Sequence, residues 1–404
     1  MNNKILLNLK FFPIYFFPLS ICLGSAVVNL MLICSTLIVI INFKKFFEYI
    51  KKNNFFIFLI FFFLYILVLS LGTKEILKGV GYLRYLFFFL LVYEFSLSKE
   101  RLKYFYITLV ILLLFLSVDI FFQRIFGSNI FGMKFSSSNM YSNRFSGFFG
   151  DELIAGSFLF KMSFILSFFF LLKKNKSINL LFSLILFLAI LITGERMSFI
   201  NYFVFLIALF YVSLRTKYFY ILFSSIVLFF VLAINFDDNS RHRYNQILYE
   251  MGLSDHDYNI SFNKDTITER LEVNSTPHLS LYKSSIIIIK EKPILGYGIK
   301  GFRDNCKAIN QHSCSSHPHN YYFEIATSFG IIGLFIFIST LYFMLKNISN
   351  IKKSNKIAIL IFFLLIINPL QTTGSIFSTI TASMFWFNLG ILIPHFKLNY
   401  EQSY

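Results

Sequence analysis

Long apolar runs are the feature that most constrains what this chain can fold into. A helix needs about 20 apolar residues to cross the hydrocarbon core of a bilayer, and runs of that length recur along the sequence. Only 14% of the 404 residues are charged, whereas soluble domains carry about 25% charged residues. We therefore predict an all-α, polytopic membrane protein. The twelve expected spans are residues 6–24, 27–43, 54–72, 80–96, 104–122, 152–172, 177–193, 197–214, 217–235, 321–345, 356–373 and 378–396.

Lysine and arginine are unevenly distributed among the connections between these spans. One alternating set of connections is rich in them, and the opposite short loops hold few. Because basic residues accumulate in cytoplasmic loops, we expect both termini to be cytoplasmic. The net charge of +17 then reflects membrane topology, and we do not expect nucleic-acid binding.

This topology divides the chain into three predicted regions. Residues 1–235 are expected to form nine transmembrane helices, and residues 321–404 three more. Residues 236–320 lie between them, on the side away from the cytoplasm. That loop region is too long for a bare linker, so we expect it to carry helices of its own. A charged loop of this size is the first place to look for function.

Two of the four cysteines lie in apolar spans, where they are expected to be small packing residues. The other two, Cys306 and Cys314, lie in the loop region. Disulfides persist on the oxidising side of a membrane, so we predict that these two pair. The alternative is a metal site that includes His312, His317 or His319. The cysteine spacing is unusual for zinc and no acidic cluster accompanies it, so we predict no metal.

Several charged residues fall within or beside the predicted spans. Charges inside a membrane are costly and tend to face a polar cavity. Arg84, Asp119 and Lys161 have this placement, with either a functional role or a structural one by snorkelling or pairing. Arg196 occupies a short turn between two spans, beside Glu195. A guanidinium at the membrane surface suits bidentate phosphate binding, and the alternative is a surface contact with Glu195.

Two histidines flank a proline where the loop region meets the span 321–345. Asn320 is a predicted N-cap of that span, and Glu324 falls in its first turn, where the helix dipole favours an acid. A helix N-terminus disfavours the imidazolium, so we expect His319 to be neutral and able to accept a proton. The alternative is a histidine that only caps the helix. We expect His317 to point elsewhere.

Small residues follow on the same face of this span. On a wheel of about 100° per residue, His319 lies over Ala326, Gly330 and Gly333. A stripe of small residues permits close packing against a neighbouring helix. We therefore expect His319 to stand above a tight helix–helix contact that borders a cavity.

His319-Asn320, followed after nine residues by Gly330-x-x-Gly333, resembles the signature of the O-antigen ligase and O-antigen polymerase family. The resemblance covers about residues 120–404, and the expected twelve helices with a large loop before the tenth are similar to the family's architecture. Three further stretches support it: LITGERMSF (191–199), KEKPILGYGIKGFR (290–303) with Gly296 and Gly298 in a P-x-x-G-x-G pattern, and DIFFQRIFG (119–127) with NRFSGFFGDELIAGSFL (143–159).

The resemblance implies a metal-independent, inverting glycosyltransferase without a cofactor, in the inner membrane of a bacterium. Its donor would be a glycan on undecaprenyl pyrophosphate, used at the periplasmic face. Carried onto this chain, the resemblance makes His319 the base that activates the acceptor hydroxyl, and Arg196 a pyrophosphate ligand. Arg84, Arg144 and Asn320 are further candidates for substrate binding.

The chain departs from the family's pattern at one place in the loop region. Many ligases carry an arginine there before an aromatic residue and a helix, whereas this chain reads HLSLYKS from His278. Either His278 takes that role or Arg270 supplies the charge. The second phosphate-binding residue is therefore left open between these two.

Three functions remain as alternatives. The leading one is an O-antigen ligase, whose acceptor is lipid A-core. The second is a polymerase of the same family, whose acceptor is the growing glycan. The third is a lipid-linked glycan flippase or other transporter, although the chain shows no internal repeats. The expected partners are the donor, the acceptor and membrane lipids.

Overall fold

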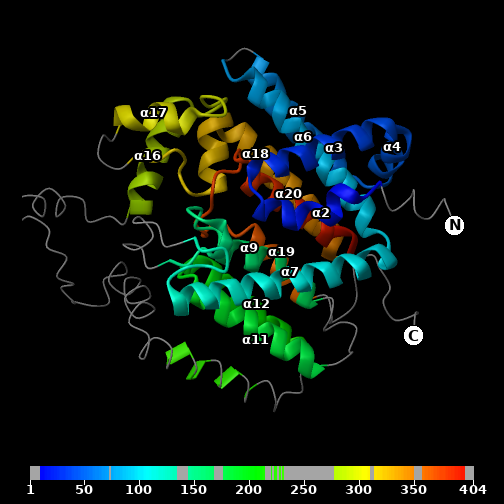
Figure 1. Cartoon of the computed structure of the whole chain (residues 1–404). Coiled ribbons are helices and arrows are strands. Elements are labelled where there is room, and N and C mark those ends of the chain that lie inside the picture. Colours follow the sequence, from blue (N-terminus) through cyan, green and yellow to red (C-terminus); the bar gives the residue numbers. More distant parts are fainter. Residues whose placement is uncertain are drawn as a thin grey trace, which may run out of the picture.

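The computed structural model describes residues 10–71, 74–133, 144–167, 176–213, parts of 220–231, 277–309, 314–349 and 357–395. The regular elements over these ranges are helices, which agrees with the predicted all-α class (Figure 1). They are α2 (Phe12–Cys22), α3 (Ser25–Ile41), α4 (Phe43–Lys52), α5 (Phe55–Leu71), α6 (Ile76–Ser96), α7 (Lys99–Phe126), the short η1 (Gly147–Phe149), α9 (Ala155–Met162), α11 (Lys176–Ile192), α12 (Arg196–Ser213), α16 (Pro277–Glu291), α17 (Gly301–Ile309), α18 (Tyr321–Ser349), α19 (Ile357–Ile366) and α20 (Thr379–His395).

The helices pack into two groups that share one apolar core. Helices α2, α3, α5, α6, α18 and α20 form the first group, and α7, α9, α11, α12 and α19 form the second. Contacts of α20 with α9 and α19, and of α6 with α7, join the two groups. The core is rich in fully buried aromatic side chains, among them Trp386 and Tyr85. Helices α16 and α17 pack against each other and against α18.

Most of the described helices lie where the apolar runs predicted spans; α4, α16 and α17 lie in the connections between them. Three of them are long and apolar enough to cross a membrane by themselves, namely Ile76–Ser96, Lys99–Phe126 and Tyr321–Asn347. The bent pair α3 and α4 gives a fourth if it is one span, and further described helices are apolar but shorter. The chain is therefore a multi-pass membrane protein. The number twelve and the three-region division stay predictions, and most of the expected span 217–235 lies outside the described residues.

Helix α4 lies where the sequence predicted only a basic connection between two spans. It bends 86° away from α3, buries Phe46 and leaves Phe43 and Phe47 exposed. Lys51 Nζ lies 4.5 Å from the centre of the Phe47 ring. The apolar face and the basic face of α4 are those of a helix that lies along a membrane surface. In Figure 1 it stands at the opposite end of the bundle from α17.

Basic residues from three connections meet at the α4 end of the bundle. Lys10 Nζ and Lys45 Nζ each lie 2.7 Å from a carboxylate oxygen of Glu94. Arg101 Nη2 donates to the Glu94 carbonyl at 3.0 Å. All three basic residues belong to the connections that the charge distribution placed on the cytoplasmic side. Their meeting at one end supports that assignment, which stays a prediction.

Helix α19 is shorter than the span 356–373 that contains it. It ends at Ile366, because Pro369 cannot continue a helix and disfavours helical backbone before it. The Gln371 side chain donates to the freed Ile366 carbonyl at 2.7 Å. Residues 367–378, which we call the linking segment, then run past the N-terminus of α18 before α20 begins.

Candidate active site

His319 sits in an unusual backbone conformation at the entry of α18. Its φ is 55°, the one positive φ at a non-glycine residue within the described ranges. That conformation costs about 1–3 kcal/mol, and it persists only where the surrounding structure holds it. Here the Thr373 N–H donates to the His319 carbonyl at 2.8 Å, so the linking segment holds the backbone in place. Strain of this kind is concentrated at functional sites.

Asn320 caps α18 as the sequence predicted. Its Oδ1 accepts from the N–H of Tyr322 at 3.0 Å and of Phe323 at 3.3 Å. Its Nδ2 donates to the Pro369 carbonyl at 2.6 Å. These bonds occupy the side chain at both ends. Asn320 therefore positions His319 between α18 and the linking segment, and its proposed role in substrate binding has no support from this geometry.

Three histidine rings gather at this point. The centre of the His319 ring lies 4.1 Å from that of His317 and 5.4 Å from that of His278. The expectation that His317 points elsewhere was wrong, because the positive φ at His319 turns the chain and brings both rings together. His278 comes from the start of α16, so the HLSLYKS stretch does reach the site. Arg270, the alternative to His278, lies outside the described residues.

The histidine cluster favours neutral imidazoles. Partial burial and the neighbouring His317 and His278 lower the pKa of His319 to about 4. Burial also lowers the pKa of His317. The Nε2 of His319 lies 3.2 Å from the Ser315 Oγ. A neutral imidazole at neutral pH is able to accept a proton from a substrate hydroxyl.

A disulfide anchors the segment that leads into this cluster. The structure joins Cys306 of α17 to Cys314, with their Cα atoms 5.8 Å apart. Cys306 is fully buried in a small apolar cluster with Leu281, Ile288 and Phe302. The chain that leads to His319 is thus tied to the packed pair α16 and α17.

The glycine stripe of α18 packs against another helix at Gly333, as expected, but not at Gly330. Gly330 has φ 66° and ψ −169°, so α18 is broken there and the wheel does not extend beyond it. A side chain at Gly330 would collide with the backbone carbonyl of Ile294. Gly333 packs against Tyr65 of α5, 3.3 Å from where a Cβ would lie. Gly330 therefore serves a contact with the loop region, and Gly333 a contact with another helix.

The P-x-x-G-x-G segment fills this break. The N–H groups of Tyr297 and Gly298 donate to the carbonyls of Thr327 and Ser328 at 3.0 and 2.7 Å, and the Ile331 N–H donates to the Pro293 carbonyl at 2.7 Å. Backbone groups that a broken helix would leave unpaired are satisfied by this segment.

Gly296 and Gly298 permit the close approach at this break. Both have positive φ, 67° and 89°. A Cβ on Gly296 would lie 2.6 Å from the Phe329 nitrogen, well inside van der Waals contact. Gly296 of one glycine pattern and Gly330 of the other thus lie on the two sides of one contact.

A pocket lined by basic side chains lies beside the histidine cluster, and we call it the basic pocket. Its volume is about 420 Å³. Ser316 belongs to its wall, and the Ser316 Oγ lies 3.0 Å from the His317 Nδ1. Lys78 and Arg84 of α6 and Lys300 and Arg303 of the loop region line it.

The charges around the basic pocket are unequal. Glu75 accepts from Lys78 at 2.9 Å and from Lys300 at 3.0 Å. Arg84 Nη2 donates to the Tyr85 hydroxyl at 3.1 Å, and its Nε is buried without a hydrogen-bond partner among the described residues. The carboxylate of Glu324 accepts from the Ser375 hydroxyl and the Ile376 N–H. Positive charge therefore exceeds negative charge at this pocket.

Sequence reasoning missed Lys78, Lys300, Arg303 and the linking segment. The signal for the linking segment was present, because residues 371–375 read QTTGS between two apolar runs. The basic residues gave no such signal. They come from segments more than 200 positions apart, and only the fold brings them together.

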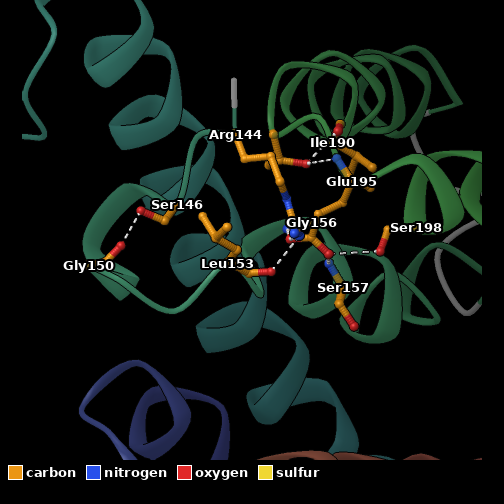
Figure 2. A network of polar contacts seen from close by, with 10 residues as sticks. Arg144, Ser146, Gly150, Leu153, Gly156, Ser157, Ile190, Glu195 and Ser198 are labelled. Carbon is orange, nitrogen blue, oxygen red and sulfur yellow. Dashed lines mark hydrogen bonds and ion pairs between the residues drawn. The ribbon is translucent and has the colours of Figure 1, made fainter. Parts of the chain in front are cut away.

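Arg144 and Glu195 belong to a separate network, shown in Figure 2. Arg144 Nη2 donates to the Leu153 carbonyl at 2.8 Å and lies 3.8 Å from Glu195 Oε1. The Glu195 carboxylate accepts from the N–H groups of Gly156 and Ser157 at 2.8 and 2.9 Å. It thereby caps the N-terminus of α9. Burial raises the pKa of Glu195, and the charge of Arg144 opposes this effect.

Arg196 is the first residue of α12, directly after the turn that the sequence predicted. It is partly buried. The carboxylate of its neighbour Glu195 is engaged by α9 and Arg144, so Glu195 has a structural partner of its own. No group of three His, Cys, Asp or Glu side chains placed to hold a metal occurs over the described residues.

Two comparisons with known proteins agree with the motifs. Residues 181–338 match the model of the O-antigen ligase family. A Rickettsia felis protein named "Putative polysaccharide ligase" is 42% identical over 73 residues, which are 16% of this chain and 18% of that protein. A Rickettsia conorii protein of the same description is 38% identical over 76 residues, 17% of this chain and 18% of that protein.

The match thus spans less than a fifth of these relatives' length. The region that matches the family model holds the turn before α12, the P-x-x-G-x-G segment, the three clustered histidines and the broken α18. Residues 181–338 of this chain are therefore similar to the O-antigen ligase family.

Proposed function

We propose that this protein transfers a glycan from a lipid-linked pyrophosphate donor to an acceptor hydroxyl, as an O-antigen ligase with lipid A-core as acceptor. One observation carries the proposal. His319 is partly buried, has a pKa lowered to about 4, and is held in a strained conformation between α18 and the linking segment. A base that is fixed in position and neutral at pH 7 is what activation of a hydroxyl requires.

The proposed reaction is a single inverting displacement without a metal or cofactor. The acceptor oxygen bonds to the anomeric carbon as the bond from that carbon to the pyrophosphate oxygen breaks. The hydroxyl proton passes to the neutral imidazole of His319. Negative charge then develops on the departing lipid pyrophosphate. Arg196 is the proposed ligand for that charge, because a guanidinium binds phosphate oxygens in a bidentate manner.

His278 and His317 support this role. Each adds a ring beside His319, and a charge on either one opposes protonation of His319 before the acceptor arrives. His278 takes the place of the family's loop arginine in this proposal. A neutral histidine donates a single hydrogen bond, so its contribution to pyrophosphate binding is smaller than that of an arginine.

A polymerase of the same family is the second candidate, because it differs only in the acceptor. Transport has less support. A broken helix is common in transporters, and α18 is broken at Gly330. Here, however, the Pro293–Gly298 segment fills the break through backbone hydrogen bonds, and three histidine rings gather at the entry of α18.

Gene deletion in the native strain separates these functions, with the wild-type gene and a His319→Asn gene returned in parallel. A ligase predicts lipid A-core without polymer while long chains accumulate on the carrier. Single-repeat lipopolysaccharide identifies a polymerase. Loss of all glycan from the far face of the membrane, with lipid-linked glycan retained inside, identifies a transporter and contradicts the proposal. The His319→Asn gene is expected to behave as the deletion does.

A further inference from the structure

The linking segment is bonded to two elements that carry different parts of the proposed reaction. On one side, the Thr373 N–H donates to the His319 carbonyl at 2.8 Å, at the entry of α18. On the other side, the Asn201 Nδ2 of α12 donates to the Gln371 Oε1 at 3.1 Å. Helix α12 begins at Arg196. The linking segment therefore joins the helix of the proposed pyrophosphate ligand to the proposed base.

The contact with α12 is a buried pair of amides. Asn201 is 4% exposed and Gln371 is 6% exposed. The Gln371 Nε2 also donates to the Ile366 carbonyl at the end of α19, at 2.7 Å. Stability alone does not require such a pair, because apolar groups of the same shape can replace two bonded polar groups at little cost. A buried hydrogen bond with satisfied partners instead fixes the position of the groups that make it.

We infer that Asn201 and Gln371 are positioning residues for His319, and that the hydrogen bond between them fixes the base relative to the start of α12. Asn201 lies five residues after Arg196, about 7.5 Å along the helix axis, and Thr373 lies two residues after Gln371. The path from Arg196 to His319 thus passes through one side-chain hydrogen bond. This inference rests on the proposed function for the roles of Arg196 and His319.

The proposed reaction makes this distance important for the rate. The acceptor hydroxyl must lie within hydrogen-bond reach of His319 while its oxygen faces the anomeric carbon of a donor held through its pyrophosphate. A misplacement of about 1 Å is able to reduce the rate about 100-fold. Binding of the donor alone needs no such alignment with His319. Loss of the Asn201–Gln371 bond should therefore lower kcat, with KM and donor binding little changed.

The test uses the full chain in detergent and breaks the bond from either side, with Asn201→Leu and with Gln371→Leu. Asn388→Leu is the matched control, because Asn388 is also fully buried but its Nδ2 donates to the Met384 carbonyl within its own helix, α20. Hydrogen exchange of peptides that contain Thr373 measures how firmly the linking segment is held. A transfer assay gives kcat and KM, and binding of farnesyl pyrophosphate, a small pyrophosphate lipid that stands for the donor, is measured separately.

In Asn201→Leu we expect exchange at Thr373 to become about tenfold faster and kcat to fall about 10- to 100-fold. KM and binding of farnesyl pyrophosphate should stay at wild-type levels. Gln371→Leu should act in the same direction, and adding Asn201→Leu to it should change little more, because both substitutions remove the same bond. Wild-type exchange or wild-type kcat in the two single variants, or equal losses in Asn388→Leu, would overturn the inference.

Failure of this inference is distinguishable from failure of the proposed function. Hydrogen exchange needs no turnover, so wild-type protection of Thr373 in both single variants overturns the inference whatever the chain catalyses. A wild-type chain that binds farnesyl pyrophosphate but transfers no glycan contradicts the proposed function instead. Faster exchange at Thr373 in Asn201→Leu would in that case still support the connection between α12 and His319.

Discussion

Two arginines that the sequence treated alike have opposite environments. Arg144 lies 3.8 Å from the Glu195 carboxylate and donates to a backbone carbonyl, so its charge is balanced inside the protein (Figure 2). Arg84 contacts a neutral tyrosine hydroxyl and lines a pocket with three other basic residues. An arginine with a carboxylate close to its guanidinium has a structural partner, whereas an arginine without one is available to a ligand. Glu195 is 51 positions from Arg144, so the sequence does not show this difference.

The largest expected effect is on folding, and it comes from a substitution at the break in α18, which the wall of the basic pocket adjoins. Gly330→Ala places a methyl group against the Ile294 carbonyl at a positive φ, so we expect little folded protein in membrane extracts. Gly127→Ala is the control, because Gly127 has φ 74° with open space around it. That change is expected to cost only about 1–2 kcal/mol. Equal yields of the two variants would falsify the proposed contact.

The next effect is on chemistry at the histidine cluster. His319→Asn keeps a residue that tolerates positive φ and removes the base, so transfer is expected to fall about 100- to 10,000-fold. Folded protein and binding of farnesyl pyrophosphate should stay at wild-type levels. His317→Asn is the matched variant, with a much smaller loss expected. Equal activity of the two variants in a reconstituted transfer assay would contradict the assignment of His319.

For the Glu195 network we expect the reverse: a loss of stability with little direct effect on glycan transfer. Glu195→Gln removes the charge that balances Arg144 and weakens the cap of α9, so the free energy of unfolding should fall by about 3 kcal/mol. Denaturant titration in mixed micelles measures it. Glu152→Gln, at an exposed acid of the preceding loop, should change little. If Glu195→Gln instead keeps full stability and loses transfer or binding of farnesyl pyrophosphate, Arg144 and Glu195 have a functional role, and the contrast with Arg84 is wrong.

A smaller effect concerns the segment before the histidines. The Cys306–Cys314 disulfide closes a loop with a separation of 8 residues, so its removal should cost about 2.5 kcal/mol in the chain-entropy model. Cys306→Ser with Cys314→Ser is compared with Cys34→Ser, at a free cysteine of α3. Two thiols at 306 and 314 that react with an alkylating reagent in denatured, unreduced protein would show that the bond is absent.

The smallest effect is the response to mild acid. With a pKa of about 4 for His319, only about a tenth of this side chain is protonated at pH 5. Transfer should therefore be nearly constant from pH 7 to pH 5, whereas a histidine with the usual pKa near 6.5 predicts a loss of about 25-fold. Because the unfolded chain binds this proton more readily, stability should fall as the pH drops from about 6.5 towards 4. A loss of transfer of about 25-fold at pH 5 would mean that the base is not held in the environment described.

The sequence predicted the helices well, because each long apolar run requires a helix in a bilayer. It also predicted the Asn320 cap, which depends on residues within one turn. What it missed depends on contacts between distant segments. The rings of His317 and His319 meet because the linking segment fixes a positive φ, and Gly330 breaks α18 because Pro293–Gly298 supplies the missing hydrogen bonds. The basic pocket likewise requires α6, α17 and α18 together.

The hydrogen bond from Ile331 to Pro293 has a consequence for how this protein is able to change over evolution. It closes residues 293–331 into a ring of chain that contains α17, the disulfide, His317, His319 and the first half of α18. Gly296 and Gly330 lie on the two sides of one contact within this ring, so a substitution on one side selects for a compensating change on the other. The unit that can be exchanged between relatives is therefore the whole ring, and a chimera with a junction between Gly298 and Gly330 joins surfaces that were not selected together.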